Sequence, residues 1–370
     1  MADTVLGGPA RAVWAFGWKH RIALSQRLAV SLMIKLLSHL SHVRLAAPDR
    51  EASARFYTEH LGLREVHRDD TSVYLRTPDD YHLFSLALEQ GPEAALVSLA
   101  WQAVSEAALR EAAERVAAAG IAGQWRARSF GRTRSFLFTG PWGHTMELVA
   151  QTDKFHQPDD DEDAATTTQA QALDHVTLAT SDVAAFLTWH GDVLGLQVVP
   201  QTLLEQSGTT VYAVLGANAT SPELGVVLDS SLRTGRLNHV AFRIDDRSEL
   251  LAAAPRLAAA GVRVEHGPTT HLEYGPSIHV LGEQNFLYVR DPGGLRVEVI
   301  TGAFLPAVPD RAPAFWRPSP GPANVYVNAR MPLSMTEGFP ADAAPTATEE
   351  GVVPGTEARL LPHPDGRPAR

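Results

Sequence analysis

The chain of 370 residues is long enough for two or more domains, and 45% hydrophobic and 20% charged residues are ordinary values for a globular protein. A net charge of −10 argues against general binding to nucleic acids or anionic membranes, because both require a basic surface. The absence of cysteine excludes disulfides and thiolate ligands and fits a cytoplasmic location, and no run reaches the roughly 18 apolar residues of a membrane span.

Residues 1–35 are interpreted as an N-terminal extension. Their apolar segments are interrupted by charge and no small-residue cleavage site follows them, which disfavours a secretory signal. Met33 lies just before the first predicted strand and is a candidate start of the working chain, so residues 1–32 need not belong to the native protein.

An internal repeat organises the next part of the chain. The segment LSHVRLAAPDREASARFYTEHLGLREV from Leu40 matches LDHVTLATSDVAAFLTWHGDVLGLQVV from Leu173 without a gap. Later segments match with small insertions, including GPWGHTMELV from Gly140 and DPGGLRVEVI from Asp291. Alternating apolar strands and helices of period near 3.6 predict two βαβββ units in each copy.

We therefore expect an α+β fold of two tandem domains, each an open, barrel-like sheet around a cavity. The N-terminal copy is assigned to residues 36–153 and the C-terminal copy to residues 171–303, joined by an acidic, Thr-rich linker at residues 154–170. Residues 304–345 are proline-rich with aromatic and Met anchors, which predicts a lid or strap, whereas residues 346–370 are predicted to be disordered.

Three ionisable residues interrupt apolar strands of the C-terminal copy: His175, His239 and Glu298. Each alone is compatible with an ordinary core histidine or an edge-exposed carboxylate. Strand alternation nevertheless places Glu298 on one face with Arg296 and Ile300, and a carboxylate that faces inward is costly unless it is paired or bound to a metal.

The N-terminal copy carries His42, Ser98 and Glu147 at the corresponding positions. Serine is a poor metal ligand, so only the later copy offers two imidazoles and a carboxylate. A purely structural requirement would act on both copies alike, whereas a metal site is needed only once. This donor set with open positions is typical of non-haem Fe(II) oxygenases, and it also binds Zn(II) or Mn(II).

The segments LDHVTLATSD, GRLNHVAF and GPSIHVLGEQNFLYVRDPGGLRVEVI resemble the type I extradiol ring-cleavage dioxygenases of the vicinal-oxygen-chelate superfamily, and the likeness covers residues 36–301. The most specific feature is a His, a Tyr nine residues later and a Glu ten residues after that, here His279, Tyr288 and Glu298. The resemblance implies a metal-free N-terminal copy, and Fe(II), with Mn(II) as the alternative, held by His175, His239 and Glu298.

The resemblance also implies an activity. A small catechol-type aromatic diol and O2 would react to give a muconic semialdehyde-type product. Tyr288 would hydrogen-bond a substrate oxygen and assist its deprotonation, and His279 would steer the bound ring or the oxygen. His271 is a competing candidate, since it ends a second GP-x-x-H motif. The family further implies a homo-oligomer.

Two positions depart from the family pattern. Many members carry a catalytic His fifteen residues before the second His ligand, where this chain has Leu224; the adjacent Glu223 would face the opposite way. Relatives acting on carboxylated catechols can carry an Arg five residues before His279, where this chain has Tyr274, which favours an uncharged diol. Two further histidines, His190 and His266, are interpreted as surface residues.

Two other functions remain open at this point. One is a Zn(II) or Ni(II) lyase or isomerase of the glyoxalase type on the same superfamily fold, which metal analysis would distinguish. The other is a non-catalytic protein that binds an aromatic ligand, which would consume no oxygen.

Overall fold

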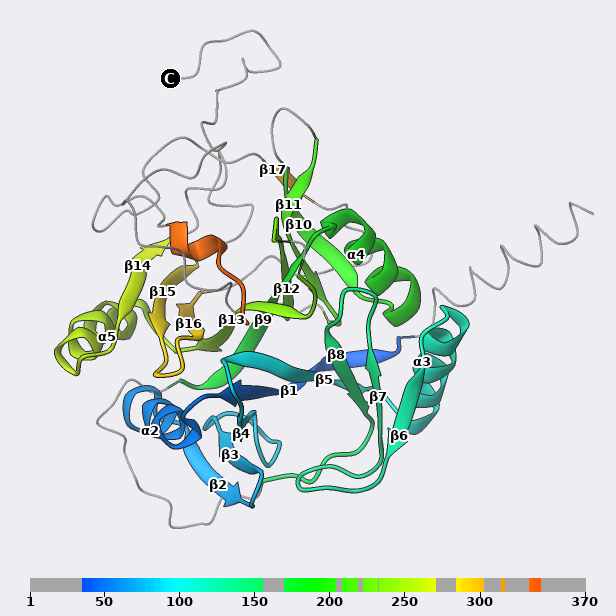
Figure 1. The fold of residues 1–370 in the computed structure, drawn as a ribbon, viewed down its shortest axis with the longest axis horizontal. Coiled ribbons are helices and arrows are strands. Elements are labelled where there is room, and N and C mark those ends of the chain that lie inside the picture. Colours follow the sequence, from blue (N-terminus) through cyan, green and yellow to red (C-terminus); the bar gives the residue numbers. More distant parts are fainter. Residues whose placement is uncertain are drawn as a thin grey trace, which may run out of the picture.

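The computed structural model describes residues 35–155, 170–203, 208–218, 222–231, 233–270, 284–302, 314–316 and 333–340. It confirms the predicted α+β fold of two tandem copies, each built from two βαβββ units. In Figure 1 the N-terminal copy runs from blue to teal and the C-terminal copy from green to orange. The N-terminal extension and most of the linker and tail lie outside the described residues, so the domain boundaries stay predictions.

The N-terminal copy forms one eight-stranded sheet in the order β2-β3-β4-β1-β5-β8-β7-β6. Its two units meet at the centre, where β1 pairs antiparallel with β5, while β1 and β4, and β5 and β8, pair in parallel. Its elements are β1 (Leu37–Ala47), α2 (Arg50–Leu61), β2 (Arg64–Arg68), β3 (Ser72–Arg76), β4 (Leu86–Gln90), β5 (Ala95–Ala103), α3 (Glu106–Ala118), β6 (Gly123–Arg126), β7 (Ser135–Thr139) and β8 (Thr145–Val149).

The C-terminal copy repeats this plan in a sheet ordered β14-β15-β16-β13-β9-β12-β11-β10-β17. Strands β16, β13 and β9 are therefore neighbours at its centre. Its elements are β9 (Ala172–Thr180), α4 (Val183–Trp189), η1 (His190–Leu194), β10 (Gln197–Leu203), β11 (Thr210–Gly216), β12 (Leu224–Leu228), β13 (Arg236–Arg243), α5 (Arg247–Ala259), β14 (Val264–Thr270), β15 (Asn285–Arg290), β16 (Arg296–Thr301), β17 (Ala314–Trp316) and η3 (Leu333–Thr336).

The repeated Asp and Leu-Gly-Leu motifs mark the two ends of one helix in each copy. Asp49 and Asp182 are N-caps whose carboxylates accept the N–H three residues on, both at 2.9 Å. Gly62 and Gly195 follow the helices with φ of 73°, a left-handed conformation that side chains rarely adopt. The most closely matching residues of the repeat are therefore helix caps. They determine where the helix in each copy begins and ends, and so how the backbone returns to the sheet.

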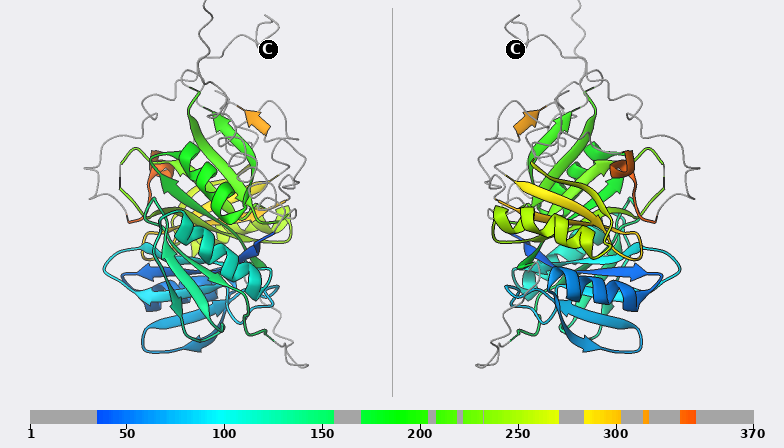
Figure 2. Two further views of the ribbon diagram at one scale, coloured as in Figure 1. Left: turned by 90° about the vertical axis from the view of Figure 1, so that its right-hand side faces the viewer. Right: turned by 90° about the vertical axis from the view of Figure 1, so that its left-hand side faces the viewer.

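The two copies pack side by side, as the two views of Figure 2 show. A single hydrophobic cluster contains buried residues from both copies, and the rings of Tyr57 and Phe242 meet across the junction at 5.9 Å between centroids. Backbone hydrogen bonds also cross it, as from Gly235 N–H to the Trp142 carbonyl at 2.7 Å. None of the helices in the described ranges is long and apolar enough to cross a membrane.

The interpretation of His190 and His266 as surface residues is wrong. His190 is 0% exposed, its ring stacks on Phe186 at 3.8 Å, and its Nδ1–H donates to the Phe186 carbonyl at 2.8 Å. It opens η1, a π-helical turn that follows α4. His266 is 5% exposed because a β-bulge in β14 turns its side chain inward.

Candidate metal centre

The three predicted ligands converge on one buried point. The Glu298 Oε2 atom lies 3.1 Å from the Nε2 atoms of both His175 and His239, and these two nitrogens are 3.1 Å apart. Strand register explains the meeting, because Ala241 on β13 pairs with Glu298 on β16 and with His175 on β9. All three side chains face one side of the sheet and are at most 4% exposed.

The geometry of these atoms fits a divalent cation. Ligands about 2.1 Å from an ion at right angles to each other are about 3.0 Å apart, close to the observed triangle. Both Glu298 oxygens lack a hydrogen-bond partner among the described residues, although the carboxylate is only 1% exposed. A buried carboxylate without donors needs a cation, and among the described residues this is the one group of three or more such side chains close enough to hold an ion.

Each imidazole is oriented by the residue before it. His175 Nδ1–H donates to Asp174 Oδ1 at 2.7 Å, and His239 Nδ1–H donates to Asn238 Oδ1 at 2.8 Å. With Nδ1 protonated, the free Nε2 lone pairs point at the common centre. The sequence interpretation missed both orienting residues, although the Asp-His and Asn-His pairs are a readable signal.

The electrostatics of the centre favour positive charge. Burial lowers the pKa of His175, but Asp174 and Glu298 outweigh it and raise that pKa to about 10. Burial lowers the pKa of His239 to about 4. Burial also raises the pKa of Glu298, yet the two imidazoles hold it well below its usual range. A bound divalent ion would displace the proton from His175.

In the N-terminal copy, the equivalent buried carboxylate has protein partners that neutralise it. Glu147 is 1% exposed, and its Oε1 lies 2.9 Å from Arg132 Nε while Ser135 Oγ donates to it. His42 Nε2 is 3.7 Å from the other oxygen. The register confirms Ser98 as the counterpart of His239, since Ser98 pairs with Arg44 two residues beyond His42. A guanidinium therefore neutralises this carboxylate.

Tyr288 lies beside the candidate centre. It is opposite Glu298 in the β15–β16 pairing, and its ring centroid is 5.2 Å from that of His239. It is 5% exposed and packs in a small cluster with Ala241, Phe286 and Ile300. The other predicted substrate-side residues, His271, Tyr274 and His279, lie outside the described residues, so their roles stay predictions.

No residue of β12 can take the place of the catalytic histidine that many family members carry at the position of Leu224. Leu224 pairs with Val176, and both belong to the hydrophobic core, so its side chain points away from the centre. The β12 residues that share a face with His175 are Gly225, opposite Thr177, and Val227, opposite Ala179. A Cβ added at Gly225 would lie 2.2 Å from Thr177 Oγ1. This close approach leaves no space there for a larger side chain.

Glu223 is engaged elsewhere. Its carboxylate accepts hydrogen bonds from Leu40 N–H at 3.1 Å, from Ala217 N–H at 3.2 Å and from Asn218 Nδ2 at 2.9 Å, which ties the two copies together. Burial raises the pKa of Glu223 to about 7 against the effect of these hydrogen bonds.

His266, which the sequence interpretation placed at the surface, lies on the same face of the sheet as Tyr288 and Glu298. Val264 pairs with Val289 and His266 pairs with Tyr288, so Glu265 is an extra residue in β14 and forms a β-bulge. The bulge turns His266 to the face of Tyr288, which in turn is opposite Glu298. His266 Nε2 is buried and finds no hydrogen-bond partner within the described part of the chain.

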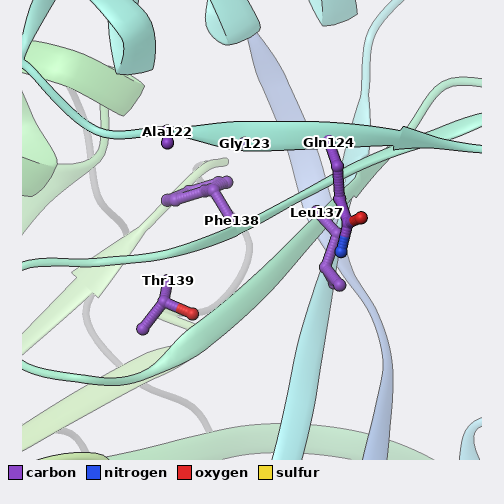
Figure 3. Close-up of a pocket in the computed structure, with 6 residues that line it drawn as sticks. All are labelled: Ala122, Gly123, Gln124, Leu137, Phe138 and Thr139. Atoms are coloured by element: carbon purple, nitrogen blue, oxygen red, sulfur yellow. The ribbon is translucent and has the colours of Figure 1, made fainter.

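A separate pocket lies in the N-terminal copy between β6 and β7. Figure 3 shows its lining, which includes no residue of the metal centre: Ala122, Gly123, Gln124, Leu137, Phe138 and Thr139. No predicted function depends on it.

Comparisons with known proteins agree with this description. The chain is 26% identical over 292 residues, 76% of its length and 90% of the relative, to a manganese-dependent 2,3-dihydroxybiphenyl 1,2-dioxygenase of Geobacillus genomosp. 3. It is 24% identical over 331 residues to a metapyrocatechase of Geobacillus stearothermophilus, covering 86% of this chain and 97% of that one. The predicted resemblance to extradiol dioxygenases is confirmed by these relatives.

The fold is shared with a solved homoprotocatechuate 2,3-dioxygenase from Brevibacterium fuscum, with a TM-score of 0.71, 23% identity and coverage of 81% of this chain and 91% of that one. That structure is an anaerobic complex with 3,4-dihydroxyphenylacetate. A family profile matches residues 39–148 and 172–299, one match for each copy of the repeat. The chain belongs to the Glyoxalase/Bleomycin resistance protein/Dioxygenase superfamily.

Proposed function

We propose that this protein is a metal-dependent extradiol dioxygenase that adds O2 to a catechol-type diol. The ring bond beside the diol breaks, both oxygen atoms enter the product, and a muconic semialdehyde-type compound results. The observation that carries the proposal is the triangle of His175 Nε2, His239 Nε2 and Glu298 Oε2, each pair 3.1 Å apart. The names of the relatives, a metapyrocatechase and a dihydroxybiphenyl dioxygenase, support it.

The residues around the centre would have two roles, metal binding and proton transfer. His175, His239 and Glu298 would hold the ion, whose role when bound is to bring diol and O2 together and to pass electrons between them. Two neutral imidazoles and one carboxylate leave one positive charge uncompensated, which favours a diol bound as its anion. Tyr288, beside His239, would hydrogen-bond the substrate oxygen and assist its loss of a proton.

We propose Fe(II) as the metal, with Mn(II) as the alternative. The donor set suits both ions, and one relative is named manganese-dependent. The test is anaerobic loading of the apoprotein with each ion, followed by oxygen uptake and the yellow product colour with a panel of catechols. Full metal binding without turnover of any diol would favour an aromatic-ligand binding protein instead. Turnover that consumes no oxygen and requires Zn(II) or Ni(II) would favour a lyase or isomerase.

An uncharged diol is the proposed substrate class. The two buried arginines nearest the centre on β15 and β16 are already committed: Arg290 Nη2 lies 2.6 Å from Glu265 Oε1 and Arg296 Nε lies 2.9 Å from Glu265 Oε2. A guanidinium held this way is not available to clamp a substrate carboxylate. A cytoplasmic location and a homo-oligomeric state remain predictions from the sequence.

Tyr288→Phe should lower kcat for ring opening by about 100-fold or more, in the range typical of a lost acid–base group. Metal content should not change, because the phenol is not a ligand. The measurement is product absorbance under saturating diol. Phe286→Leu, two residues earlier on the same face of β15, is the packing control and should cost far less. Equal losses in both variants would assign Tyr288 a packing role.

His266→Gln should lower kcat/KM by about tenfold while metal content stays at the wild-type level. The reason is loss of the hydrogen bond that this buried imidazole, which has no partner among the described residues, would make to the substrate on the face that it shares with Tyr288. Steady-state kinetics with an unsubstituted catechol measures it, and His60→Gln on α2 is the control. An unchanged kcat/KM in His266→Gln would remove this residue from the site.

A further inference from the structure

A segment near the C-terminus lies across the metal-binding half of the sheet. Residues 333–340, here called the strap, begin with η3 and end in an antiparallel bridge in which Phe339 and Leu237 exchange two backbone hydrogen bonds of 2.6 and 2.8 Å. In Figure 1 the strap is the orange segment close to β14 and β15. Phe339 is 3% exposed and lies 5.0 Å below the Arg290 guanidinium. The strap is thus anchored to β13 next to His239.

The strap determines which way the Asn238 amide points. Asn238 Nδ2 donates to the carbonyls of Met335 and Glu337 at 3.2 and 3.3 Å, and its Oδ1 accepts from His239 Nδ1 at 2.8 Å. An amide turned by 180° would face the strap carbonyls with its oxygen and His239 Nδ1–H with its NH2 group, so all three bonds would be lost. With the strap in place, only one orientation satisfies both sides.

A β-bulge makes this relay possible. Leu237 pairs with Leu178 and His239 pairs with Thr177, so Asn238 is an extra residue in β13 and its side chain can lie beside that of its neighbour. The N-terminal copy has the same bulge, with Val97 as the extra residue between Leu96 and Ser98. The polar residue therefore occurs only in the copy that has the ligands.

Arg296 fastens the strap to the same strand. Its guanidinium donates to the backbone carbonyls of Asn238 and Glu337, each at 3.1 Å, and to that of Ser334. Glu265 balances the charge. Met335 packs against the cluster that contains Tyr288. Seating of the strap therefore places Met335 against the Tyr288 cluster and orients Asn238 at the same time.

The orientation of His175, the other histidine ligand, does not depend on the strap. His175 is oriented by Asp174, and both oxygens of a carboxylate accept hydrogen bonds, so no orientation of that side chain is wrong. An amide has one accepting end, and a second contact must select it. The two ligands thus differ in what holds them: His175 depends on its own strand, and His239 depends on the strap.

We propose that the strap sets the metal affinity of the site through Asn238, a positioning residue that passes the seating of residues 333–340 to the His239 ligand. The proposal rests on the proposed metal site. It predicts that loosening the strap releases metal even when every ligand is intact. It also predicts that the loss of metal affinity depends on the Asn238 amide and does not involve the hydrogen bond between Asp174 and His175.

The test is the dissociation constant for Mn(II), measured on the full-length apoprotein by the electron paramagnetic resonance signal of free Mn(II). Asn238→Ala should weaken binding about 10- to 100-fold, the range for partners that orient ligands. Phe339→Ala should also weaken binding, but should add little in the Asn238→Ala background, because the relay is already broken. Asn238→Asp keeps an accepting oxygen on His239 in any orientation, so it should bind near the wild-type level and should resist Phe339→Ala.

Asp174→Ala supplies the matched control. It should weaken Mn(II) binding by loosening His175, and Phe339→Ala should then multiply that loss by its full single-variant factor, because the two act on different ligands. Melting temperatures identify any variant that fails to fold. Unchanged Mn(II) affinity in folded Phe339→Ala, or equal factors in the Asn238→Ala and Asp174→Ala backgrounds, would overturn the proposal. Failure of the wild-type protein to bind Mn(II) would instead refute the metal site itself.

Discussion

Glu298→Gln should remove both metal binding and ring cleavage, with a loss in kcat/KM beyond the roughly 100-fold typical of residues that only orient ligands. The amide has nearly the size of the carboxylate, so packing is preserved and the change isolates charge. Without the carboxylate the centre keeps two neutral imidazoles and loses the negative charge that attracts a divalent ion. Metal content by mass spectrometry and oxygen uptake with catechol measure the two effects separately.

The repeat provides the control in the same molecule. Glu147 occupies the equivalent place, paired with Ala100 on β5 as Glu298 is paired with Ala241 on β13. Glu147→Gln should leave metal content and kcat unchanged and should affect only folding stability. Full metal content in Glu298→Gln, or loss of metal in Glu147→Gln, would contradict the assignment of the centre to the C-terminal copy.

The meeting of His175, His239 and Glu298 was predictable because its determinants are periodic. The repeat aligned Glu298 with Glu147 and His175 with His42, and strand alternation placed Glu298 on the inner face, which the register confirms. The difference between the copies, Ser98 in place of a histidine, indicated which copy holds the ligands. None of these inferences needed knowledge of long-range contacts.

Two of the departures from expectation, at His266 and at Leu224, share a physical cause, which is that bulges and register break the alternation of strand residues. An extra residue in β14 turned His266 inward, and a register in which Leu224 is opposite Val176 sent the family position to the core. The contact of the strap with Asn238 joins residues about a hundred positions apart in the chain. Nothing in the local pattern of either segment encodes such a pairing.

Arg132→Met should destabilise the protein by about 3–5 kcal/mol, the usual result when one partner of a buried ion pair is removed. Methionine fills most of the volume of the arginine stem, so the change leaves the Glu147 carboxylate buried without the guanidinium 2.9 Å away. The measurement is the free energy of unfolding in urea at pH 7. Metal content should stay unchanged, since the centre in the other copy keeps all of its ligands.

The pH dependence makes this prediction sharper. Burial alone would raise the pKa of Glu147, but His42, Arg132 and Ser135 outweigh it and lower the pKa to about 2. A lowered carboxyl pKa contributes stability that is present above the unfolded value of about 4.3 and is lost as the pH falls toward 2. The wild-type contribution of this group should therefore be constant from pH 5 to 8.

In Arg132→Met the pKa of Glu147 should rise from about 2 toward its unfolded value, because one of the three groups that outweigh burial is removed while His42 and Ser135 remain. The stability that this group contributes above the unfolded pKa should therefore be smaller than in the wild type, by about 1.4 kcal/mol for each unit by which its pKa has risen. The double variant Arg132→Met, Glu147→Gln carries no charge to bury, so it should recover much of the loss. An undiminished loss in the double variant would mean that Arg132 does not compensate Glu147, and that the N-terminal copy does not use a guanidinium in place of a metal.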